Sequence, residues 1–306
     1  NETGKADDIE IRLKDEKKMW SGPWLPRKGD TIQAAIVHTV SGNEKRLELG
    51  RFSIDELEFT GPPSIVSIKG VSIPLNTDIR RLQKTRAWED AALSEIAAEV
   101  AATGELELLF ITDADPKYQR IDQREESDLK FLMRLCDQEG YSLKITDRQL
   151  VLFDPDKQRE EPPVKSLVMG RDYIKSWNFK TQSHDVYSTI IVVFKDPLTG
   201  DLNEYTYTDP NVVGGQTSRL VKRAESIEEA ERRAKAAMRR HNRLESTGTL
   251  TLMGSTDLVT GATIEYSSGS AWDGKFIITK ATHTVAAGYD VSIDIAAVKL
   301  EGEQLA

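Results

Sequence analysis

The chain has 306 residues, of which 39% are hydrophobic and 30% charged, and it carries a formal net charge of −9. This length is enough for two or three domains, and the composition is typical of a globular protein and excludes a disordered or fibrous one. The negative charge argues against general binding to DNA or RNA, although a local basic patch is compatible with it, and no apolar run approaches the roughly 18 residues of a membrane span.

Cysteine usage and the first residues indicate where the chain is made. The single cysteine, Cys136, cannot form an internal disulfide, which suits a reducing compartment and synthesis in the cytoplasm. The N-terminus lacks the basic and apolar segments of a signal peptide. It also begins without Met and enters a strand-like run almost at once, so we expect residues upstream of Asn1 to be missing and the first domain to be truncated.

Residues 1–82 predict an all-β domain. Short runs in which polar and apolar residues alternate are separated by turn signals rich in Gly and Pro, a pattern typical of antiparallel strands. We expect a small β-barrel or sandwich. The runs are DIEIRLKD, TIQAAIVHTV, RLELGRFSIDELEF and PSIVSIKGVSI.

Residues 83–153 predict a small α+β domain. The segment TRAWEDAALSEIAAEVAATG, which begins at Thr85, predicts a helix because its apolar residues share one face and Gly104 ends it. A strand ELELLFI and a second helix follow, and SLKIT and QLVLFD then flank TDR as a β-hairpin.

Residues 154–165 predict a linker, and residues 166–306 predict a second all-β domain. The linker is charged and contains adjacent prolines. Strand patterns resume after it and are interrupted by a helical insertion near 226–245. The expected fold class is mainly β with an α+β insertion, in which two antiparallel β-barrel domains are joined by the small α+β domain.

The second helix of the middle domain lies within QREESDLKFLMRLCDQEGY, which holds both clustered carboxylates and the only cysteine. Its residues can be explained by structure alone. Asp122 and Glu125 have the spacing of an N-terminal capping pair, Cys136 lies on the apolar stripe, and Gly140 stops the pattern. We therefore expect a structural helix with a buried, unreactive cysteine.

The catalytic alternative for this segment is a hydrolase. Glycoside hydrolysis requires two carboxylates on opposite sides of a cleft. Glu125 or Glu126 would supply one of them, and Asp113 or Asp115 the other.

The sequence contains no other catalytic or cofactor motif. The histidines at His38, His184, His241 and His283 form no HExxH or HxH pattern, so no zinc site is expected. Neither a GxxxxGK[ST] loop nor a GxSxG elbow occurs. We expect no catalytic, cofactor-binding or metal-binding residues.

The helix that begins at Ser226 carries a strongly basic half. Ser226 and Glu229 form a capping box, and acidic residues precede basic ones by four positions along the helix. The basic face either meets an acidic partner or nucleic acid, or is a solvated face matched to the helix dipole, which we favour. Its basic residues are Arg232, Arg233, Lys235, Arg239, Arg240 and Arg243.

Trp20 and Trp24, in MWSGPWLP, lie beside turn residues. They either pack under the end of a barrel or serve as interface anchors, and the sequence does not separate the two.

The order of five stretches along nearly the whole chain resembles the late-control protein D family of contractile phage tails, relatives of the baseplate hub and of the N-terminal module of VgrG spikes. No single stretch is diagnostic; their order and spacing carry the resemblance. They are KADDIEIRLKDEKKMWSGPWLPRKGD, LGRFSIDELEFTGPPSIVSIKG, LQKTRAWEDAALSEIAAEVA, ESDLKFLMRLCDQEGYSLKITDRQLVLF and LVTGATIEYSSGSAWDGKFIITKATHTVAAGYDVSIDI.

This resemblance implies a homotrimer in which each chain carries two barrels that imitate tail-tube subunits. Three chains then present a pseudo-sixfold ring to the tail tube protein and threefold symmetry to a trimeric spike protein. It further implies contacts with other baseplate proteins, assembly in the bacterial host cytoplasm, a place in the virion tail, and a central channel that DNA passes without specific binding. Nothing up to Ala306 resembles a spike β-helix or a lysozyme module, so we expect any penetrating tip on a separate chain.

The resemblance therefore favours a structural baseplate hub protein, and not an enzyme, that links the tail tube to the spike of a contractile phage tail or a related injection device. The alternatives are a tail-associated cell-wall (peptidoglycan) hydrolase and a cell-wall binding module in the middle domain.

Overall fold

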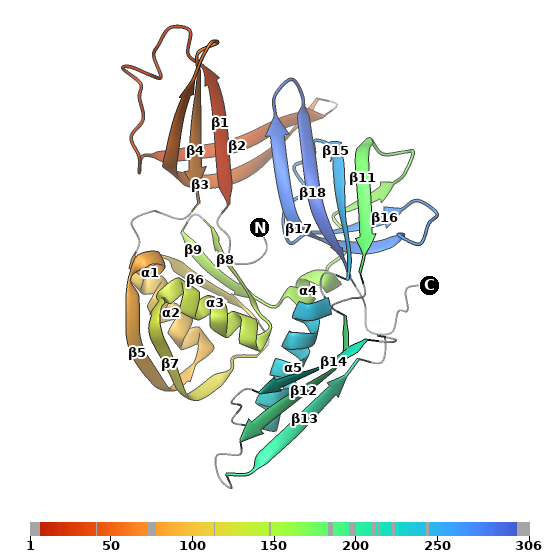
Figure 1. The fold of residues 1–306 in the computed structure, drawn as a ribbon. Helices are drawn as coiled ribbons and strands as arrows, with labels where there is room; N and C mark the ends of the chain where they lie inside the picture. Colours follow the sequence, from red (N-terminus) through yellow and green to blue (C-terminus); the bar gives the residue numbers. More distant parts are fainter. Residues whose placement is uncertain are drawn as a thin grey trace. The chain divides into compact units, whose positions relative to one another are not determined.

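The computed structural model describes residues 7–40, 42–72, 78–112, 114–146, 148–182, 186–195, 200–209, 212, 215–221, 224, 226–242 and 245–298. The chain is mainly β and forms two compact units (Figure 1). The first unit contains the described residues up to Met133 together with Leu143–Phe153; the second contains Arg134–Ser142 and the residues from Asp154 onward. In the part of the chain described, no helix has both the length and the apolar composition needed to cross a membrane.

The N-terminal sheet is open and antiparallel, with strand order β1-β4-β3-β2. In β1, Ile9, Ile11 and Leu13 alternate with exposed polar residues and are themselves only half-buried. The core of this sheet is small, since Ile54, Val66 and Ile68 form its buried centre. The strands are β1 (Asp8–Lys14), β2 (Thr31–Val40), β3 (Asn43–Thr60) and β4 (Ile65–Val71).

The middle region combines a two-stranded ribbon, β5-β7, and a three-stranded sheet, β6-β9-β8, with helices. The predicted α+β character is confirmed. The elements are α1 (Asp78–Arg81), β5 (Gln83–Ala92), α2 (Leu93–Thr103), β6 (Glu107–Ile111), β7 (Lys117–Ser127), α3 (Asp128–Glu139), β8 (Ser142–Thr146) and β9 (Gln149–Phe153).

The predicted start of the first helix is wrong. The residues from Thr85 to Ala92 belong to β5, and α2 begins only at Leu93. Pairing with β7 decides the conformation, because alternate β5 side chains are half-buried while their neighbours are exposed. Long-range strand pairing thus overrides the local helical pattern.

The predicted capping pair of the second helix is also wrong. Asp122 and Glu125 lie in β7, where Glu125 has a φ of 48° beside an irregularity in the pairing with β5. Ser127 precedes α3 instead, and its hydroxyl accepts a hydrogen bond from the backbone N–H of Lys130 (3.4 Å). The predicted stop is confirmed: Gly140 has a φ of 81°, and the next N–H bonds back to the carbonyl of Cys136 (2.8 Å).

The predicted linker contains regular structure, the short helix α4 (Pro155–Glu160). After it, Val164 donates a backbone hydrogen bond to Thr263 (2.8 Å), so the chain joins the next sheet before the predicted linker ends at residue 165.

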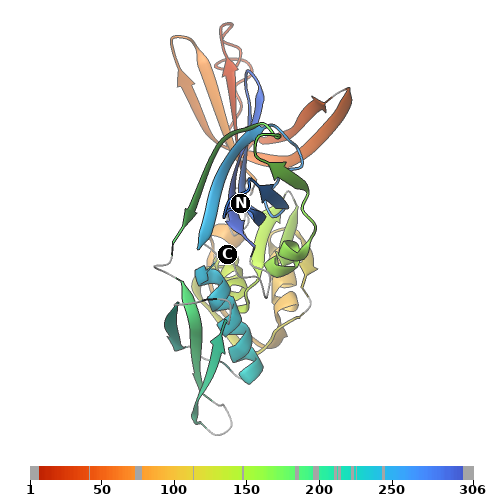
Figure 2. The same cartoon turned by 90° about the vertical axis from the view of Figure 1, so that its right-hand side faces the viewer.

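A six-stranded sheet, drawn in green and blue in Figure 2, forms the body of the second unit. Its strand order is β10-β16-β17-β18-β15-β11. All its pairs are antiparallel except β10 with β16, which is parallel. Its core is much larger than that of the N-terminal sheet and contains Leu250, Ile278 and Ile293. The strands are β10 (Lys165–Val168), β11 (Ile174–Thr181), β15 (Ser246–Met253), β16 (Thr263–Ser267), β17 (Gly274–Val285) and β18 (Tyr289–Ala297).

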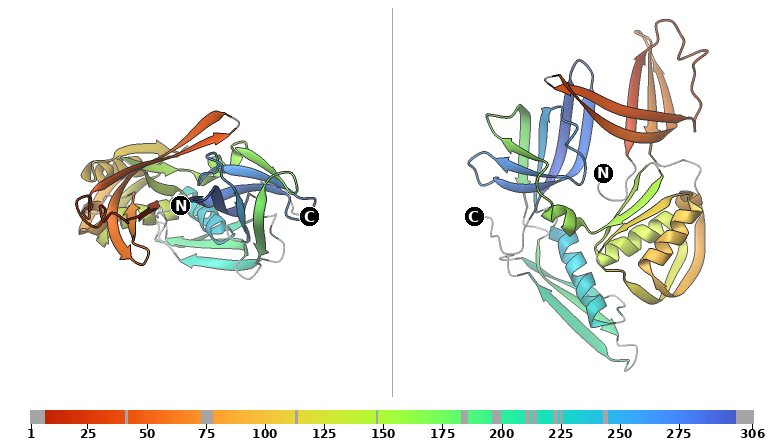
Figure 3. Two further views of the ribbon diagram at one scale, coloured as in Figure 1. Left: turned by 90° about the horizontal axis from the view of Figure 1, so that it is seen from above. Right: turned by 180° about the vertical axis from the view of Figure 1, so that it is seen from behind.

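The predicted helical insertion is confirmed, but it is larger than a helix. Between β11 and β15, which pair directly, the chain forms a separate sheet of order β13-β12-β14 with α5 packed on β12 (Figure 3). We call the described residues from Val186 to Asn242 the inserted module. Its elements are β12 (Tyr187–Lys195), β13 (Leu202–Thr208), β14 (Gln216–Val221) and α5 (Ile227–Asn242).

The predicted fold class is therefore confirmed, with one difference in closure. Neither the four-stranded nor the six-stranded sheet closes on itself within the described residues, so each is a half-barrel with two outer strands. The periodicity that predicts strands carries no information on closure.

Truncating a buried side chain of the six-stranded sheet tests this core. Ile293 is fully buried, so Ile293→Ala is expected to lower the free energy of unfolding by about 2–5 kcal/mol. Urea unfolding followed by circular dichroism measures the change. Thr282→Ala, at an exposed position of β17, is the control and is expected to change stability by less than about 0.5 kcal/mol; equal losses would contradict the assigned core.

Candidate functional site

A buried charged network holds the middle region together. Asp128, whose side chain is fully buried, accepts hydrogen bonds from Lys84 Nζ (2.6 Å), Arg86 (3.0 Å) and Gln123 Nε2 (2.9 Å). Gln123 is also fully buried, and its amide oxygen accepts a hydrogen bond from Arg86 Nε (2.9 Å). Two cations therefore compensate the buried carboxylate, and its place in the first turn of α3 adds the favourable helix dipole.

Arg86 extends the network to α2. It donates a third hydrogen bond, to Glu99 (2.6 Å), which also accepts one from the indole N–H of Trp88 (2.7 Å). The guanidinium lies 4.3 Å from the Trp88 ring centroid, and that ring stacks on Phe131 of α3 at 4.8 Å. The network thus joins β5, β7, α2 and α3. Both of its carboxylates, Asp128 and Glu99, form ion pairs within it.

The carboxylates that the hydrolase alternative requires lie beside different elements of the middle region. Asp115 accepts hydrogen bonds from the backbone N–H (3.0 Å) and hydroxyl (2.5 Å) of Ser94 at the start of α2. Glu125 is exposed on β7, whereas Glu126 is buried there. Asp113 lies outside the described residues.

Asp122 forms ion pairs at the surface and does not cap a helix. It accepts hydrogen bonds from Arg124 (2.7 Å) and Arg120 (3.1 Å), and these bonds lower the pKa of its carboxyl group.

Cys136 is buried on the apolar side of α3, as predicted. Burial raises the pKa of its thiol, and the nearby Asp137 and Glu139 raise it further. The thiolate that a nucleophile or metal ligand requires is therefore strongly disfavoured.

The histidines are dispersed. His38 lies half-buried in β2, His241 is near the end of α5, and His283 in β17 lies 2.8 Å from the Tyr289 hydroxyl. Burial lowers the pKa of His283. His184 is outside the described residues, and among those described no group of His, Cys, Asp and Glu could hold a metal ion.

The basic helix α5 meets an acidic surface of its own chain. The predicted cap is confirmed, since the backbone N–H of Glu229 donates to the Ser226 hydroxyl (3.2 Å). Arg232 does not remain in solvent but donates to Glu139 at the end of α3 (3.0 Å), and the Glu139 side chain is fully buried. The favoured interpretation of a solvated face is therefore wrong for this part of the helix.

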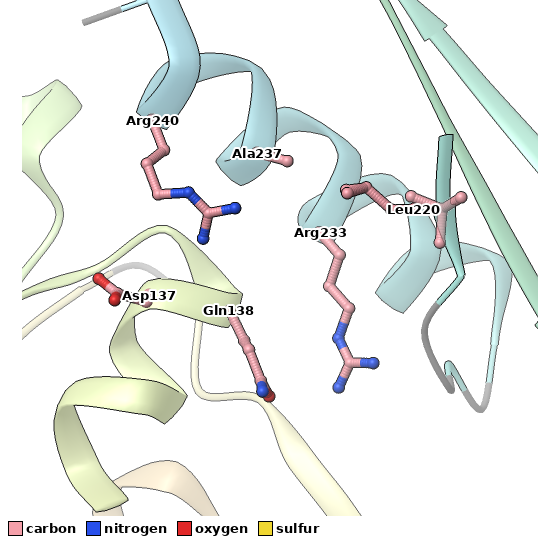
Figure 4. A pocket seen from close by; sticks show the side chains of 7 residues that line it. Asp137, Gln138, Leu220, Arg233, Ala237 and Arg240 are labelled. Carbon is pink, nitrogen blue, oxygen red and sulfur yellow. The ribbon is translucent and has the colours of Figure 1, made fainter. Parts of the chain in front are cut away.

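A small cavity separates the two helices (Figure 4). It is lined by Arg233, Ala237 and Arg240 of α5 and by Asp137 and Gln138 of α3, with two apolar side chains of the inserted module. The guanidinium groups extend from α5 toward the end of α3 (Figure 4). Arg243 lies outside the described residues.

Of the two tryptophans near the N-terminus, Trp20 packs against a core and Trp24 is exposed. The buried carboxylate of Asp15 accepts backbone hydrogen bonds from Trp20 (2.9 Å) and Ser21 (3.0 Å), which fixes the loop after β1. Trp20 packs against the core of the N-terminal sheet, whereas Trp24 contacts it edge to face at 5.7 Å and is 57% exposed. Trp24 therefore stays a candidate interface anchor.

The outer strand β11 offers a second apolar surface. Most of its residues are exposed on both faces, and Trp177 (56% exposed) and the preceding Tyr173 (78%) project from it. Phe179 connects Trp177 (6.1 Å) to Trp272 (5.2 Å) and so to the core. This surface cannot be predicted from the sequence, because alternation does not reveal which strand ends a sheet.

Within the described residues, the candidate functional features are surfaces: open sheet edges, the half-buried apolar face of the N-terminal sheet and exposed aromatic anchors. Similar folds are found among tail proteins. The 43 kDa tail protein of prophage MuSo2 from Shewanella oneidensis has a TM-score of 0.68 at 15% identity, over 97% of this chain and 91% of that one. The E. coli c3393 protein, described as a type VI secretion component similar in structure to T4 tail proteins gp27 and gp5, has a TM-score of 0.57 at 12% identity, over 95% and 69%.

The fold class is thus that of phage tail and secretion-system components. Residues 77–289 match the family described as the phage tail baseplate hub (GPD), and the chain belongs to this family. The resemblance to the late-control protein D family is confirmed.

Two curated relatives carry the same description. The chain is 32% identical over 152 residues to the probable baseplate hub protein of Escherichia phage P2, and 29% identical over 199 residues to that of Escherichia phage 186. These matches cover 48% and 63% of this chain, but only 37% and 49% of the relatives. The chain thus spans about half or less of the length of the curated relatives it matches.

Removing the charge of Asp128 tests the network. In Asp128→Asn two cations lose their buried partner, so the free energy of unfolding is expected to fall by about 3–5 kcal/mol in a denaturant titration. Asp122→Asn removes exposed pairs in the neighbouring strand and is expected to change it by at most about 1 kcal/mol. If the two variants behaved alike, the network would not be the stabilising element.

Thiol reactivity tests the burial of Cys136. The native chain is expected to react slowly with a thiol-specific reagent, and denaturant is expected to restore the rate of an exposed cysteine. Full modification of the native chain at the rate of a free thiol would contradict the buried position.

Proposed function

We propose that the chain is a structural baseplate hub protein that links the tail tube to the trimeric spike of a contractile phage tail or a related injection device. The observation that carries this proposal is the pair of open half-barrel sheets, each with exposed apolar residues beside its core. Membership of the baseplate hub family supports it independently.

Open sheets favour association because outer strands present backbone N–H and C=O groups that a neighbouring chain can cover. The N-terminal sheet adds an apolar face that its own small core leaves half-exposed. We assign the ring-forming role to residues 1–82 and 166–306, with residues 83–153 between them. Different surfaces then meet in a closed ring, and the proposed assembly is a homotrimer.

The proposed partners are the tail tube protein, the spike protein and other baseplate proteins, after assembly in the host cytoplasm and within the virion tail. The net charge of −9 suits a central channel that DNA passes without binding.

We propose no enzymatic role for this chain. Of the groups that the sequence offered as catalytic, Asp115 caps the start of α2, Glu126 is buried in β7, and Cys136 fills the core. No arrangement among the described residues favours peptidoglycan hydrolysis or cell-wall binding; a peptidoglycan release assay and an insoluble-peptidoglycan pulldown are expected to be negative.

Self-association tests the hub proposal. Light scattering over a concentration series is expected to show a trimer, and Trp177→Ser or Trp24→Ser is expected to weaken it about tenfold or more, as for central aromatic anchors.

Leu202→Ser is the matched control, since Leu202 is 75% exposed but lies on β13 of the inserted module. A chain that stays monomeric at every concentration, alone and with its spike protein, would contradict the proposal. Equal weakening by all three variants would contradict the assigned surfaces.

A further inference from the structure

The inserted module is attached to the six-stranded sheet by a narrow neck. Its two connections leave and enter that sheet side by side, where Thr181 pairs with Ser246 and Gln182 donates to the Glu245 carbonyl (2.9 Å). At its base, Asn242 accepts a hydrogen bond from the backbone N–H of Tyr187 (2.9 Å). The module thus meets the sheet at neighbouring points.

The module also has a core of its own. On α5, Ala230, Ala234 and Met238 are buried against Ile190 and Val192 of β12. The apolar stripe of α5 is therefore satisfied inside the module, and the helix presents a different face to α3.

The contact with α3 is made by charged side chains. Arg232 pairs with the buried Glu139, and Arg233 pairs with Glu229 on α5 itself (2.5 Å). The Arg239 guanidinium lies over Gly140, where a side chain on that glycine would collide with it. Four arginines of α5, counting Arg240, thus meet the acidic end of α3, where helix carbonyls add negative charge.

Small residues also meet at this joint. Ala236 of α5 lies against Gly140, where an added Cβ would lie 3.0 Å from the alanine methyl. The core of the module is formed between α5 and β12, so separating α5 from α3 leaves that core buried.

We propose that this joint is an electrostatic latch: the inserted module moves about its neck as a folded body, and the pairing of Arg232 with Glu139 keeps it closed. Neutralising Glu139 removes the buried carboxylate that Arg232 meets across the joint, and so opens the latch. Such openings without global unfolding are a general property of proteins.

Thiol trapping in the full chain tests the latch, in a Cys136→Ala background. Ala236→Cys reports on the joint, because Ala236 is buried there. Adding Glu139→Gln, or Arg232→Gln as a second route, is expected to raise its modification rate about tenfold or more. Raised salt is expected to accelerate it as well, since it screens the separated charges.

Two controls separate opening from unfolding. Ala234→Cys lies in the module core and is expected to stay protected in every background. Glu231→Gln removes a pair with Lys235 along the exposed side of α5 and is expected to leave the Ala236→Cys rate unchanged. Equal acceleration at both cysteines would show unfolding of the module, and no acceleration in either charge variant would show a joint held by other forces; each result would overturn the latch.

Discussion

The incomplete closure of the two large sheets is the constraint on which the rest of the structure depends. A strand at the edge of a sheet has backbone donors and acceptors without a partner strand, and proteins cover, shorten or charge such edges. Here β11 and β2 end their sheets, and β11 carries exposed aromatic side chains. In our proposal, neighbouring chains supply the missing cover, so that a ring completes what one chain leaves open.

Helix α3 is held at both of its ends by polar contacts. The Asp128 network joins two strands and two helices through buried, paired charges, and separating β5 from α3 would leave the buried Asp128 carboxylate without its partners. At the other end of α3, Glu139 meets the arginines of α5. One helix therefore carries a buried carboxylate contact at each end. The helix dipole favours the anion at its start and the cations that approach its end, whereas Glu139 itself, an anion at the C-terminal end, is stabilised by Arg232.

The sequence predicts those elements whose signals are local. The alternation of Ile9, Ile11 and Leu13 identifies β1, the Ser226 cap identifies the start of α5, and Gly140 identifies the end of α3. The chemistry of Cys136 follows from its place on the apolar stripe.

Elements that depend on distant partners could not be predicted in this way. The segment from Thr85 to Ala92 has the composition of a helix, but its pairing with β7 and the stacking of Trp88 on Phe131 make it a strand. The basic residues of α5 carry no sign that Glu139, far away in the sequence, is their partner. Likewise, no local pattern reveals that β11 pairs with β15 across the inserted module, or that the sheets stay open.

The central claim, that association between chains covers the open sheet edges, is tested most directly by hydrogen exchange of the chain below and above its association concentration. The account predicts slower exchange in β2 and β11 on association, with unchanged exchange in β13, the outer strand of the inserted module. Unchanged exchange in β2 and β11, or slowing that is equal in all three strands, would contradict it.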